Sequence, residues 1–378
     1  MRSRKILFVV TEDWYFCSHR LDLAIAAKKA GYNVIVATRI ADHQEQIERH
    51  GIRTIKLLHM KRSSLNPLRE MTAFIELLLL VRRETPDLLH MVALKPVIYG
   101  SLASRLLGIS YRVSALGGLG FIFSSKRTLA RFLRPILLTV FRVIFNDPRS
   151  RLILQNENDW SLVTKKAGVD QCNVRLIRSA GVNLDKYTET VLPKGKPIVM
   201  LASRMLWDKG IGEFVNAAEL LHKQGVNALF ILIGLPDIEN PSSIPHEQLQ
   251  EWNNTRIVEW WGYRNNMAEI FSQASIVCLP SYYGEGVPKV LIEAMACARP
   301  IVTTDMPGCR DLVRGKRNGL MVKPKNSADL AEALKLLLNN PSLCHKMGRE
   351  GRLIAEKEYS LTKVISETLN VYQELLSQ

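Results

Sequence analysis

Residues 197–210 read PIVMLASRMLWDKG and divide into an apolar run, a short loop and the start of a helix. The run PIVMLAS has the length and composition of a buried strand, and Lys209 and Gly210 stand where a helix begins. Further along the chain, helical patterns separate the strand-like runs ALFILIG, RIVEWWG, ASIVCLPS and PIVTTD. This alternation predicts an α/β domain with a parallel sheet covered by helices.

The first half of the chain shows the same alternation. Its strand-like runs are KILFVV, YNVIVAT, IRTIKLL, DLLHMVA, ISYRVSAL and RLILQN, and one helix is expected from Ser18, as its cap, to Ala30. A chain of 378 residues exceeds the size of one hydrophobic core. Because the periodicity stops between Gly181 and Pro197, we predict two Rossmann-like domains facing across a cleft. They span residues 1–182, joined by a terminal helix at 360–378, and residues 197–359.

Charge is distributed unevenly between the two halves. Up to and including Lys186 there are 30 Lys and Arg against 15 Asp and Glu, and after it 21 against 21, which together give the 51 and 36 of the whole chain. The net charge of +15 therefore lies in the first half, which predicts an anionic surface or acceptor for that domain. No recognised RNA or DNA motif accompanies these basic residues, which argues against nucleic-acid binding.

The cellular location is predicted from features that the sequence lacks. No apolar stretch approaches the roughly 20 residues of a bilayer span, and the charged start MRSRK runs into a strand without a cleavage site. The six cysteines show no C-x2-C pairing, which indicates reduced thiols and no structural zinc site. We therefore expect a cytoplasmic protein.

Two cations stand in the loop that follows PIVMLAS. Arg204 comes directly after the strand-like run, and Lys209 follows five residues later at the beginning of a helix. A planar guanidinium, an ammonium and a helix N-terminus together suit a diphosphate. The same groups stabilise the charge that develops when a diphosphate leaves. The alternative is two ordinary solvated cations at the surface.

The segment GEGVPKVLIE presents carboxylates at a second strand-to-helix junction. Two glycines flank Glu285, Pro288 suits a first helical turn, and Glu293 lies two turns down the helix. The backbone N–H groups of Gly286 and Val287 are expected to face a ligand, whose sugar hydroxyls the two carboxylates can bind. The alternative is that Glu285 only favours a helix N-terminus and that Glu293 is a surface residue. Apolar neighbours make Glu293 an awkward place for an unpaired charge.

With these motifs the chain resembles the retaining glycosyltransferases of family 4, which have the GT-B fold. SRMLWDKG matches their diphosphate-binding R-x4-K motif, and EGVPKVLIE matches their E-x7-E motif. The resemblance implies that Arg204 and Lys209 hold the donor diphosphate, that Glu285 faces the donor sugar, and that Glu293 binds the nucleotide ribose. It implies catalysis without a metal or another cofactor, in agreement with a sequence that has no Asp-x-Asp motif near these positions.

Segments of the first half narrow the resemblance. WYFCSHRLDLA, KRSSLNP and SALGGLG, with the later DIENPSS, are similar to bacterial transferases that act on undecaprenyl-diphosphate-linked saccharides in O-antigen, capsule and glycoprotein glycan assembly, N-acetylgalactosaminyltransferases among them. This implies transfer of an N-acetylhexosamine or hexose from a UDP-sugar to a polyprenyl-diphosphate-linked saccharide, with retained anomeric configuration. Many family members have a His after the fourth strand where this chain reads SALGGLG, so no such role is carried over.

Basic residues of the first half are candidates for contacts with the acceptor and the membrane. Arg20 at the start of the first helix and Arg62 after IRTIKLLHM are placed to bind an acceptor phosphate. Arg127, Arg131 and Arg134 belong to a segment in which arginines gather on one side of a helix and apolar residues occupy much of the rest. Such a helix can lie among anionic headgroups, so we expect peripheral attachment to the inner face of the plasma membrane. The alternatives are surface arginines and a core helix with one basic face.

Two other functions fit parts of this pattern. A sugar-nucleotide 2-epimerase shares the architecture but needs an acid and a base beside the sugar and no lipid-facing basic segment. A non-catalytic sugar-nucleotide sensor bound to a membrane is the other. Incubation with the donor alone and with a lipid acceptor separates all three.

Overall fold

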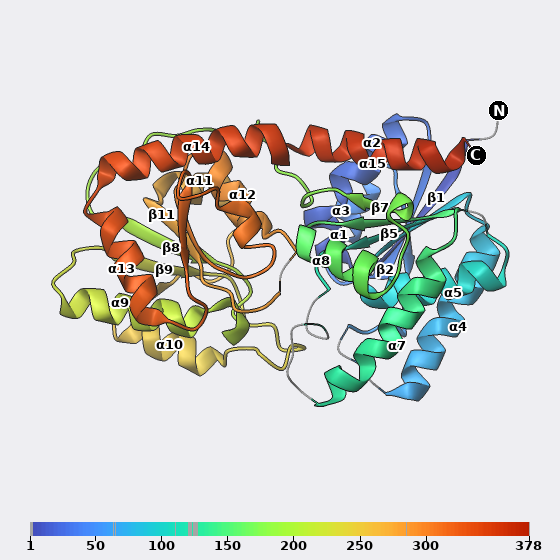
Figure 1. Ribbon diagram of the computed structural model, residues 1–378, viewed down its shortest axis with the longest axis horizontal. Coiled ribbons are helices and arrows are strands. Elements are labelled where there is room, and N and C mark those ends of the chain that lie inside the picture. Colours follow the sequence, from blue (N-terminus) through green and yellow to red (C-terminus); the bar gives the residue numbers. More distant parts are fainter. Residues whose placement is uncertain are drawn as a thin grey trace. The chain divides into compact units, whose positions relative to one another are not determined.

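The computed structural model describes residues 3–62, 64, 66–109, 111–119, 123, 128–284 and 286–377. The chain forms two compact units, each built on one sheet (Figure 1). The N-terminal unit comprises Met1–Ala180 and Thr362–Gln378, and the C-terminal unit comprises Gly181–Leu361. Every strand pairing in the described part of the chain is parallel, as the strand and helix alternation predicts.

The N-terminal sheet has seven strands in the order β3-β2-β1-β4-β5-β6-β7. Its strands are β1 (Lys5–Glu12), β2 (Asn33–Arg39), β3 (Arg53–Lys56), β4 (Leu88–Val92), β5 (Tyr111–Leu116), β6 (Ser150–Leu154) and β7 (Val174–Leu176). The α-helices described in this unit are α1 (Asp13–His19), α2 (Leu21–Lys29), α3 (Gln44–Glu48), α4 (Pro67–Glu84), α5 (Leu94–Leu106), α7 (Thr128–Phe145), α8 (Glu157–Ser161) and α15 (Leu361–Leu376).

Helices cover both faces of this sheet (Figure 1). On β1, Leu7 and Val9 pack in one core with α4, α5 and α7, whereas Phe8 packs in a second core with α2 and α15. Successive strand residues point to opposite faces, so a strand that is buried on both faces must be apolar throughout. This is why the runs KILFVV and DLLHMVA are nearly continuous in apolar residues.

The C-terminal sheet has six strands in the order β10-β9-β8-β11-β12-β13. Its strands are β8 (Ile198–Ala202), β9 (Leu229–Ile233), β10 (Glu259–Trp260), β11 (Ile276–Leu279), β12 (Ile301–Thr304) and β13 (Gly319–Val322). The described helices are α9 (Ile211–Lys223), α10 (His246–Asn254), α11 (Met267–Gln273), α12 (Lys289–Ala296), α13 (Ser327–Leu338) and α14 (Pro341–Tyr359).

This sheet is also covered on both faces and sets the positions of the predicted motifs. Val199 and Leu201 of β8 pack with α9, α10 and α13, and Met200 packs with α11 and α12. β8 pairs directly with β11 and, on its other side, with β9. Since parallel strands end at the same edge, the loops that follow these three strands are neighbours there. The two predicted motifs follow β8 and β11.

One predicted helix is interrupted in the structure. The pattern from Ser18 to Ala30 was expected to form a single helix capped by Ser18, but α1 ends at His19 and α2 begins at Leu21. Arg20 between them has φ −133° and ψ −13°. Phe16 and Leu21 are both buried, and five residues apart on one straight helix they would point about 140° away from each other. The break at Arg20 allows both side chains to enter the core.

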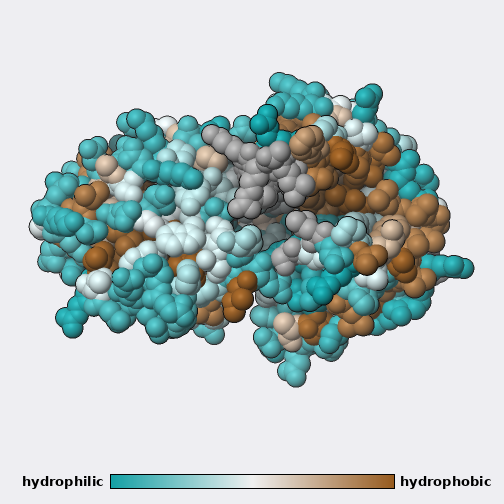
Figure 2. Space-filling view, turned by 90° about the horizontal axis from the view of Figure 1, so that it is seen from below, coloured by the Kyte–Doolittle hydropathy of each residue, from teal (hydrophilic) through white to brown (hydrophobic). Residues whose placement is uncertain are grey.

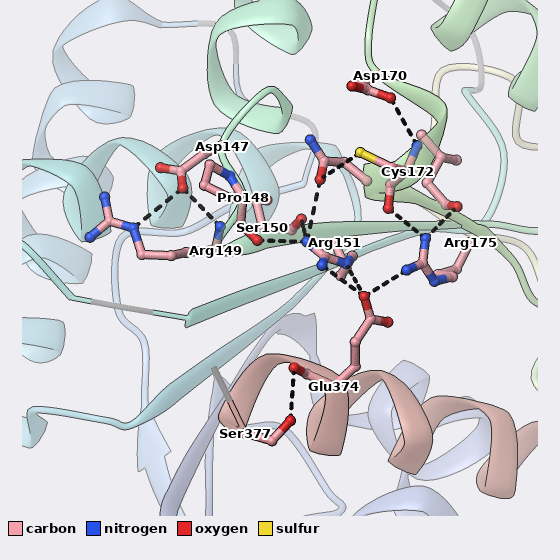
Figure 3. Close-up of polar contacts among 12 residues, drawn as sticks. Asp147, Pro148, Arg149, Ser150, Arg151, Asp170, Cys172, Arg175, Glu374 and Ser377 are labelled. Carbon is pink, nitrogen blue, oxygen red and sulfur yellow. Dashed lines mark hydrogen bonds and ion pairs between the residues drawn. The ribbon is translucent and has the colours of Figure 1, made fainter.

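The last helix, α15, packs on the N-terminal unit. Its Tyr372 and Leu375 belong to the core that α2 forms with the sheet. Glu374 accepts hydrogen bonds from Arg151 and Arg175, at 2.8 and 2.7 Å, and these arginines lie on β6 and β7 (Figure 3). Apolar packing and two ion pairs therefore hold this end of the chain against the first sheet.

In the ranges that the structure describes, no helix combines the length and the apolar character that crossing a bilayer requires.

Candidate active site

The loop after β8 brings two cations and a helix N-terminus to the carboxyl edge of the C-terminal sheet. Arg204 lies two residues beyond the strand, with its side chain 40% exposed. Lys209 ends a short 3-10 turn, and α9 follows directly. The N-cap of α9 is Gly210, which has no side chain to bind the first N–H groups of the helix. Lys209 thus lies beside a helix end that attracts anions, and Arg204 lies in the same loop.

Arg204 already has an acidic neighbour in the C-terminal unit. Its Nη1 donates a hydrogen bond to Oδ2 of Asp237 at 2.5 Å. Asp237 lies in the loop after β9, and its own backbone N–H donates to the Ser243 hydroxyl. The carboxylate holds the guanidinium at the sheet edge and offsets part of its charge. A diphosphate that binds here competes with Asp237 for Arg204.

Two glycines let the loops at this edge approach one another closely. Gly210 has φ +77°, and a Cβ there would lie 2.1 Å from the carbonyl oxygen of Pro280. Gly234 has φ +135°, and a Cβ there would lie 1.8 Å from the carbonyl oxygen of Ser203. Only glycine fits at either position, because both the backbone conformation and the space exclude a side chain. The loops after β8, β9 and β11 are therefore packed backbone against backbone.

Hydrogen bonds join the first motif to the chain that leads into the second. The Ser281 hydroxyl and the Tyr282 backbone N–H both donate to the Asp208 carbonyl, each at 3.1 Å. Asp208 lies between the two predicted cations in sequence, and Ser281 and Tyr282 follow β11. The structure thus joins the R-x4-K segment to residues that lie shortly before the E-x7-E segment in the chain.

The second motif is described except for its first carboxylate. Glu285 lies outside the described residues. Gly286 and Val287 are buried just before α12, and Val287 is 6% exposed. Pro288 is the N-cap of this helix, so the helix begins one residue later than the sequence pattern predicts. Like α9, α12 starts without a side-chain cap and aims its first N–H groups at the carboxyl edge of the sheet.

Glu293 is held by neighbours of the C-terminal unit. Its carboxylate lies 3.6 Å from the Lys289 ammonium and accepts a hydrogen bond from the Tyr187 hydroxyl. Burial raises the pKa of Glu293, and Lys289 and Tyr187 offset part of that rise. Glu293 is therefore not an unpaired charge in its apolar surroundings, because Lys289 forms an ion pair with it. Its binding of a ribose stays a prediction.

Several residues at this edge were not singled out in the sequence. Asp237 and Tyr187 are two, and a third is Lys325, whose Nζ lies 4.3 Å from the centroid of the Tyr282 ring. Lys325 follows β13 and therefore lies at the same edge as Arg204 and Lys209, because parallel strands end at one edge of their sheet. β13 was not predicted because its apolar run, 320–322, is only three residues long and has polar residues close on both sides.

Arg20, the first predicted acceptor contact, is buried in the N-terminal unit. It is 6% exposed, and its Nε has no hydrogen-bond partner in the described part of the chain. Its charge acts on His90 of β4 and Tyr372 of α15, which hydrogen-bond each other. Burial, and next the Arg20 charge, lower the pKa of His90 well below its usual value, so this imidazole is neutral. Contact of Arg20 with an acceptor stays a prediction.

Arg62, the second predicted acceptor contact, is half-buried in the loop between β3 and α4. Lys95, near the start of α5, holds this loop: its Nζ donates to the carbonyls of Lys61 and Ser64, at 2.8 and 2.6 Å. The same ammonium pairs with Glu70 of α4 at 2.9 Å. Lys95 was not singled out in the sequence, yet it fixes the segment that carries Arg62.

Within the described ranges, no three His, Cys, Asp or Glu residues are arranged to hold a metal ion.

Each of the two units matches a model of a known protein family. A family model described as "Glycosyl transferases group 1" matches residues 185–354, and one described as "Glycosyl transferase 4-like" matches residues 5–156. Among curated proteins, the chain is 29% identical to an N,N'-diacetylbacillosaminyl-diphospho-undecaprenol α-1,3-N-acetylgalactosaminyltransferase of Campylobacter jejuni, over 86% of each chain. It is 21% identical to an Escherichia coli UDP-Gal:α-D-GlcNAc-diphosphoundecaprenol α-1,3-galactosyltransferase, over 82% of this chain and 81% of the relative.

A solved structure has a similar fold over nearly the whole length of the chain. HepE of Anabaena in complex with UDP-glucose aligns with a TM-score of 0.75 at 18% identity, covering 97% of this chain and 99% of HepE. At that identity the likeness concerns the fold.

Proposed function

Because this chain belongs to the group 1 glycosyltransferases, family GT4 with the GT-B fold, we propose that it transfers a sugar from a UDP-sugar to a polyprenyl-diphosphate-linked saccharide. The sugar is an N-acetylhexosamine or a hexose, and its anomeric configuration is retained. The observation that carries the proposal is the convergence of Arg204, Lys209 and two uncapped helix N-termini at one edge of the C-terminal sheet. The relatives from Campylobacter jejuni and Escherichia coli, both named for undecaprenyl-diphosphate-linked substrates, support the acceptor.

The donor diphosphate is assigned to Arg204 and Lys209. A diphosphate spreads its negative charge over several oxygens, which a planar guanidinium and a compact ammonium can bind from different directions. The N–H groups at the start of α9 add partial positive charge beside Lys209. As the bond between the sugar and the diphosphate breaks, negative charge grows on the diphosphate, and these groups stabilise it more than they stabilise the intact donor.

The remaining donor contacts are assigned to the second motif. Glu285 faces the donor sugar, the N–H groups of Gly286 and Val287 lie beside it, and Glu293 accepts hydrogen bonds from the ribose. In this scheme the departing diphosphate, held by the two cations, accepts the proton of the acceptor hydroxyl on the same face of the sugar. Arg20 and Arg62 of the N-terminal unit remain the candidates for the acceptor phosphates.

The test is formation of product from purified protein. The protein is incubated with each of a panel of UDP- and GDP-sugars, together with a short polyprenyl-diphosphate saccharide and EDTA. We expect one of the UDP-sugars to give an extended lipid-linked product. Proton NMR of that product then shows whether the anomeric configuration of the donor is retained. Conversion of the donor sugar without an acceptor would indicate an epimerase instead. Binding of the donor with no product would indicate a sensor, and inhibition by EDTA that a divalent ion reverses would contradict catalysis without a metal.

Attachment to an anionic membrane is proposed for the face that α4, α5 and α7 form. α7 has two apolar sides: Leu137, Phe141 and Ile144 are buried in the core, whereas other apolar side chains point outward. The outward apolar residues of the three helices, 39% to 79% exposed, are Leu68, Met71, Ile75, Leu79, Leu102, Leu106, Phe132, Ile136 and Val143. Figure 2 shows hydrophobic residues gathered on this side of the N-terminal unit. Apolar residues edged by arginines suit a headgroup plane.

Charge reversal on α7 and at the residue before it is expected to release the protein from anionic vesicles. Changing Arg127, Arg131 and Arg134 to Glu should lower the fraction bound to phosphatidylglycerol vesicles at least about tenfold, since each basic residue near such a surface contributes about 1 kcal/mol. Arg131 is exposed and Arg134 half-buried, whereas Arg127 lies outside the described residues. Vesicle flotation measures the effect, and raising the salt concentration should weaken binding of the unchanged protein in the same way.

Replacing an exposed apolar residue by Ser tests the same membrane face, and the same kind of change in the C-terminal unit is its control. Phe132→Ser removes a 72% exposed ring from α7 and should also weaken flotation, whereas Ile238→Ser removes a 95% exposed side chain from the C-terminal unit and should have no effect. Flotation that none of the α7 variants changes would reject this membrane face.

A further inference from the structure

An open pocket of about 580 Å³ lies at the amino edge of the N-terminal sheet. It is formed where α5 and α7 end and β6 begins, so it is at the opposite edge of this sheet from the strand ends that the acceptor residues follow. Its lining residues are Arg105, Arg142, Val143, Asn146, Asp147, Pro148 and Arg149. Neither predicted motif contributes to it, and it belongs to the N-terminal unit alone.

Positive charge exceeds negative charge in this part of the chain. Between residues 101 and 156 there are nine Lys and Arg against one Asp, and no Glu. The single carboxylate, Asp147, accepts a hydrogen bond from the buried Arg112. It also accepts one from Arg149, whose Nε lies at 3.3 Å (Figure 3). Arg105 donates to the carbonyl of Val143 in the last turn of α7. The Arg142 guanidinium makes no hydrogen bond or ion pair with any residue that the structure describes.

Part of this charge has a structural role. Arg105 and Arg142 stand in the last turns of α5 and α7, where a cation offsets the negative end of the helix dipole. The C-terminal end of each of the two helices counts as about half a negative charge, and Asp147 adds one full negative charge. Four arginines surround these groups, so about two positive charges remain unbalanced. The four are Arg105, Arg112, Arg142 and Arg149. Burial lowers the pKa of the Arg112 guanidinium, Asp147 offsets part of that fall, and the charges of Arg105 and Arg149 lower the pKa further.

We propose that this pocket binds a phosphate group. Two unbalanced positive charges match the charge of a phosphate, and guanidinium N–H pairs match the spacing of its oxygens. Arg142 and Arg149 are exposed and carry the binding, while Arg112 is buried behind them with Asp147. The phosphate belongs either to a lipid headgroup or to a free phosphorylated molecule. The apolar residues Leu106 and Val143 beside the pocket, 70% and 51% exposed, continue the face proposed for the membrane.

The experiment measures binding of inorganic pyrophosphate and of vesicles to the same variants. The test variant is Arg142→Ala with Arg149→Ala, and the control is Lys29→Ala with Arg49→Ala, which removes the same charge from exposed positions elsewhere in this unit. Calorimetry with pyrophosphate is done in excess UDP and excess short polyprenyl-diphosphate saccharide, so that the donor site and the proposed acceptor site are both occupied. Flotation uses phosphatidylcholine vesicles with and without phosphatidylglycerol, and thermal unfolding confirms that all variants fold.

We expect the test variant to bind pyrophosphate at least about tenfold more weakly than the unchanged protein, and the control to bind it normally. If flotation on phosphatidylglycerol falls as well, beyond the fall in the control, the phosphate is that of a headgroup. If only pyrophosphate binding is lost, the ligand is a free phosphorylated molecule. Normal pyrophosphate binding by the test variant overturns the proposal, whatever the flotation shows. Turnover with a soluble acceptor should stay normal in both variants, so this result is independent of the proposed reaction.

Discussion

Lys209→Met is expected to lower kcat by about 100-fold or more while the melting temperature of the protein hardly changes. Removing one group that stabilises developing charge costs about 10² to 10³ in kcat, because that charge exists only in the transition state. Met keeps the apolar stem of the half-buried lysine and removes only its ammonium. Steady-state kinetics with the UDP-sugar and the lipid acceptor measure the effect, and it should appear in kcat more than in KM.

Lys223→Met is the matched control for this substitution. Lys223 ends the same helix that Lys209 precedes, and its 70% exposed side chain pairs with Glu219 at the surface. Such exposed pairs contribute at most about 1 kcal/mol to stability, and this one lies at the opposite end of α9 from the proposed site. Its kcat should stay within about a factor of two. A normal kcat for Lys209→Met would remove this lysine from the reaction and, with it, the proposed role of the R-x4-K segment.

Gly210→Ala is expected to destabilise the C-terminal unit by about 2 to 4 kcal/mol and to reduce turnover more than tenfold. One part of the cost is the left-handed backbone at φ +77°, worth about 1 kcal/mol or more for a residue with a Cβ. The other part is the contact with the Pro280 carbonyl at 2.1 Å, which can be relieved only by moving the backbone. That movement displaces Lys209 and the start of α9. Urea unfolding and kcat report the two effects.

Gly225→Ala separates the contact from the backbone conformation. Gly225 follows α9, has φ +74° and would place its Cβ in open space, with nothing within 4 Å. It should cost only the conformational part, about 1 kcal/mol, and leave kcat unchanged. The difference between the two variants therefore measures the packing of the β8 loop against the segment after β11. Equal loss of stability in both would show that this packing contributes nothing.

Strands in the middle of both sheets could be predicted because they are buried on two faces. β1, β4, β8 and β9 appear in the sequence as runs with hardly a polar residue, as expected for strands between two layers of helices. β7 and β13 were not predicted, because neither has more than three apolar residues in a row and polar residues stand close on both sides. The break between α1 and α2 was missed for a different reason. It depends on which side chains the core can accept at Arg20, and no local pattern contains that information.

The order of residues alone determined the family, the two-sheet architecture and the positions of Arg204 and Lys209 after β8. These follow from hydrophobic periodicity and from motifs that are local in sequence. Only the tertiary structure decided which of those groups have partners. Asp237 reaches Arg204 across 33 positions, Glu374 reaches Arg151 across 223, and the arginines around the α5 and α7 ends meet in one pocket. The physical reason is that the strength of a charge depends on the groups packed around it, and packing joins parts of the chain that lie far apart in sequence.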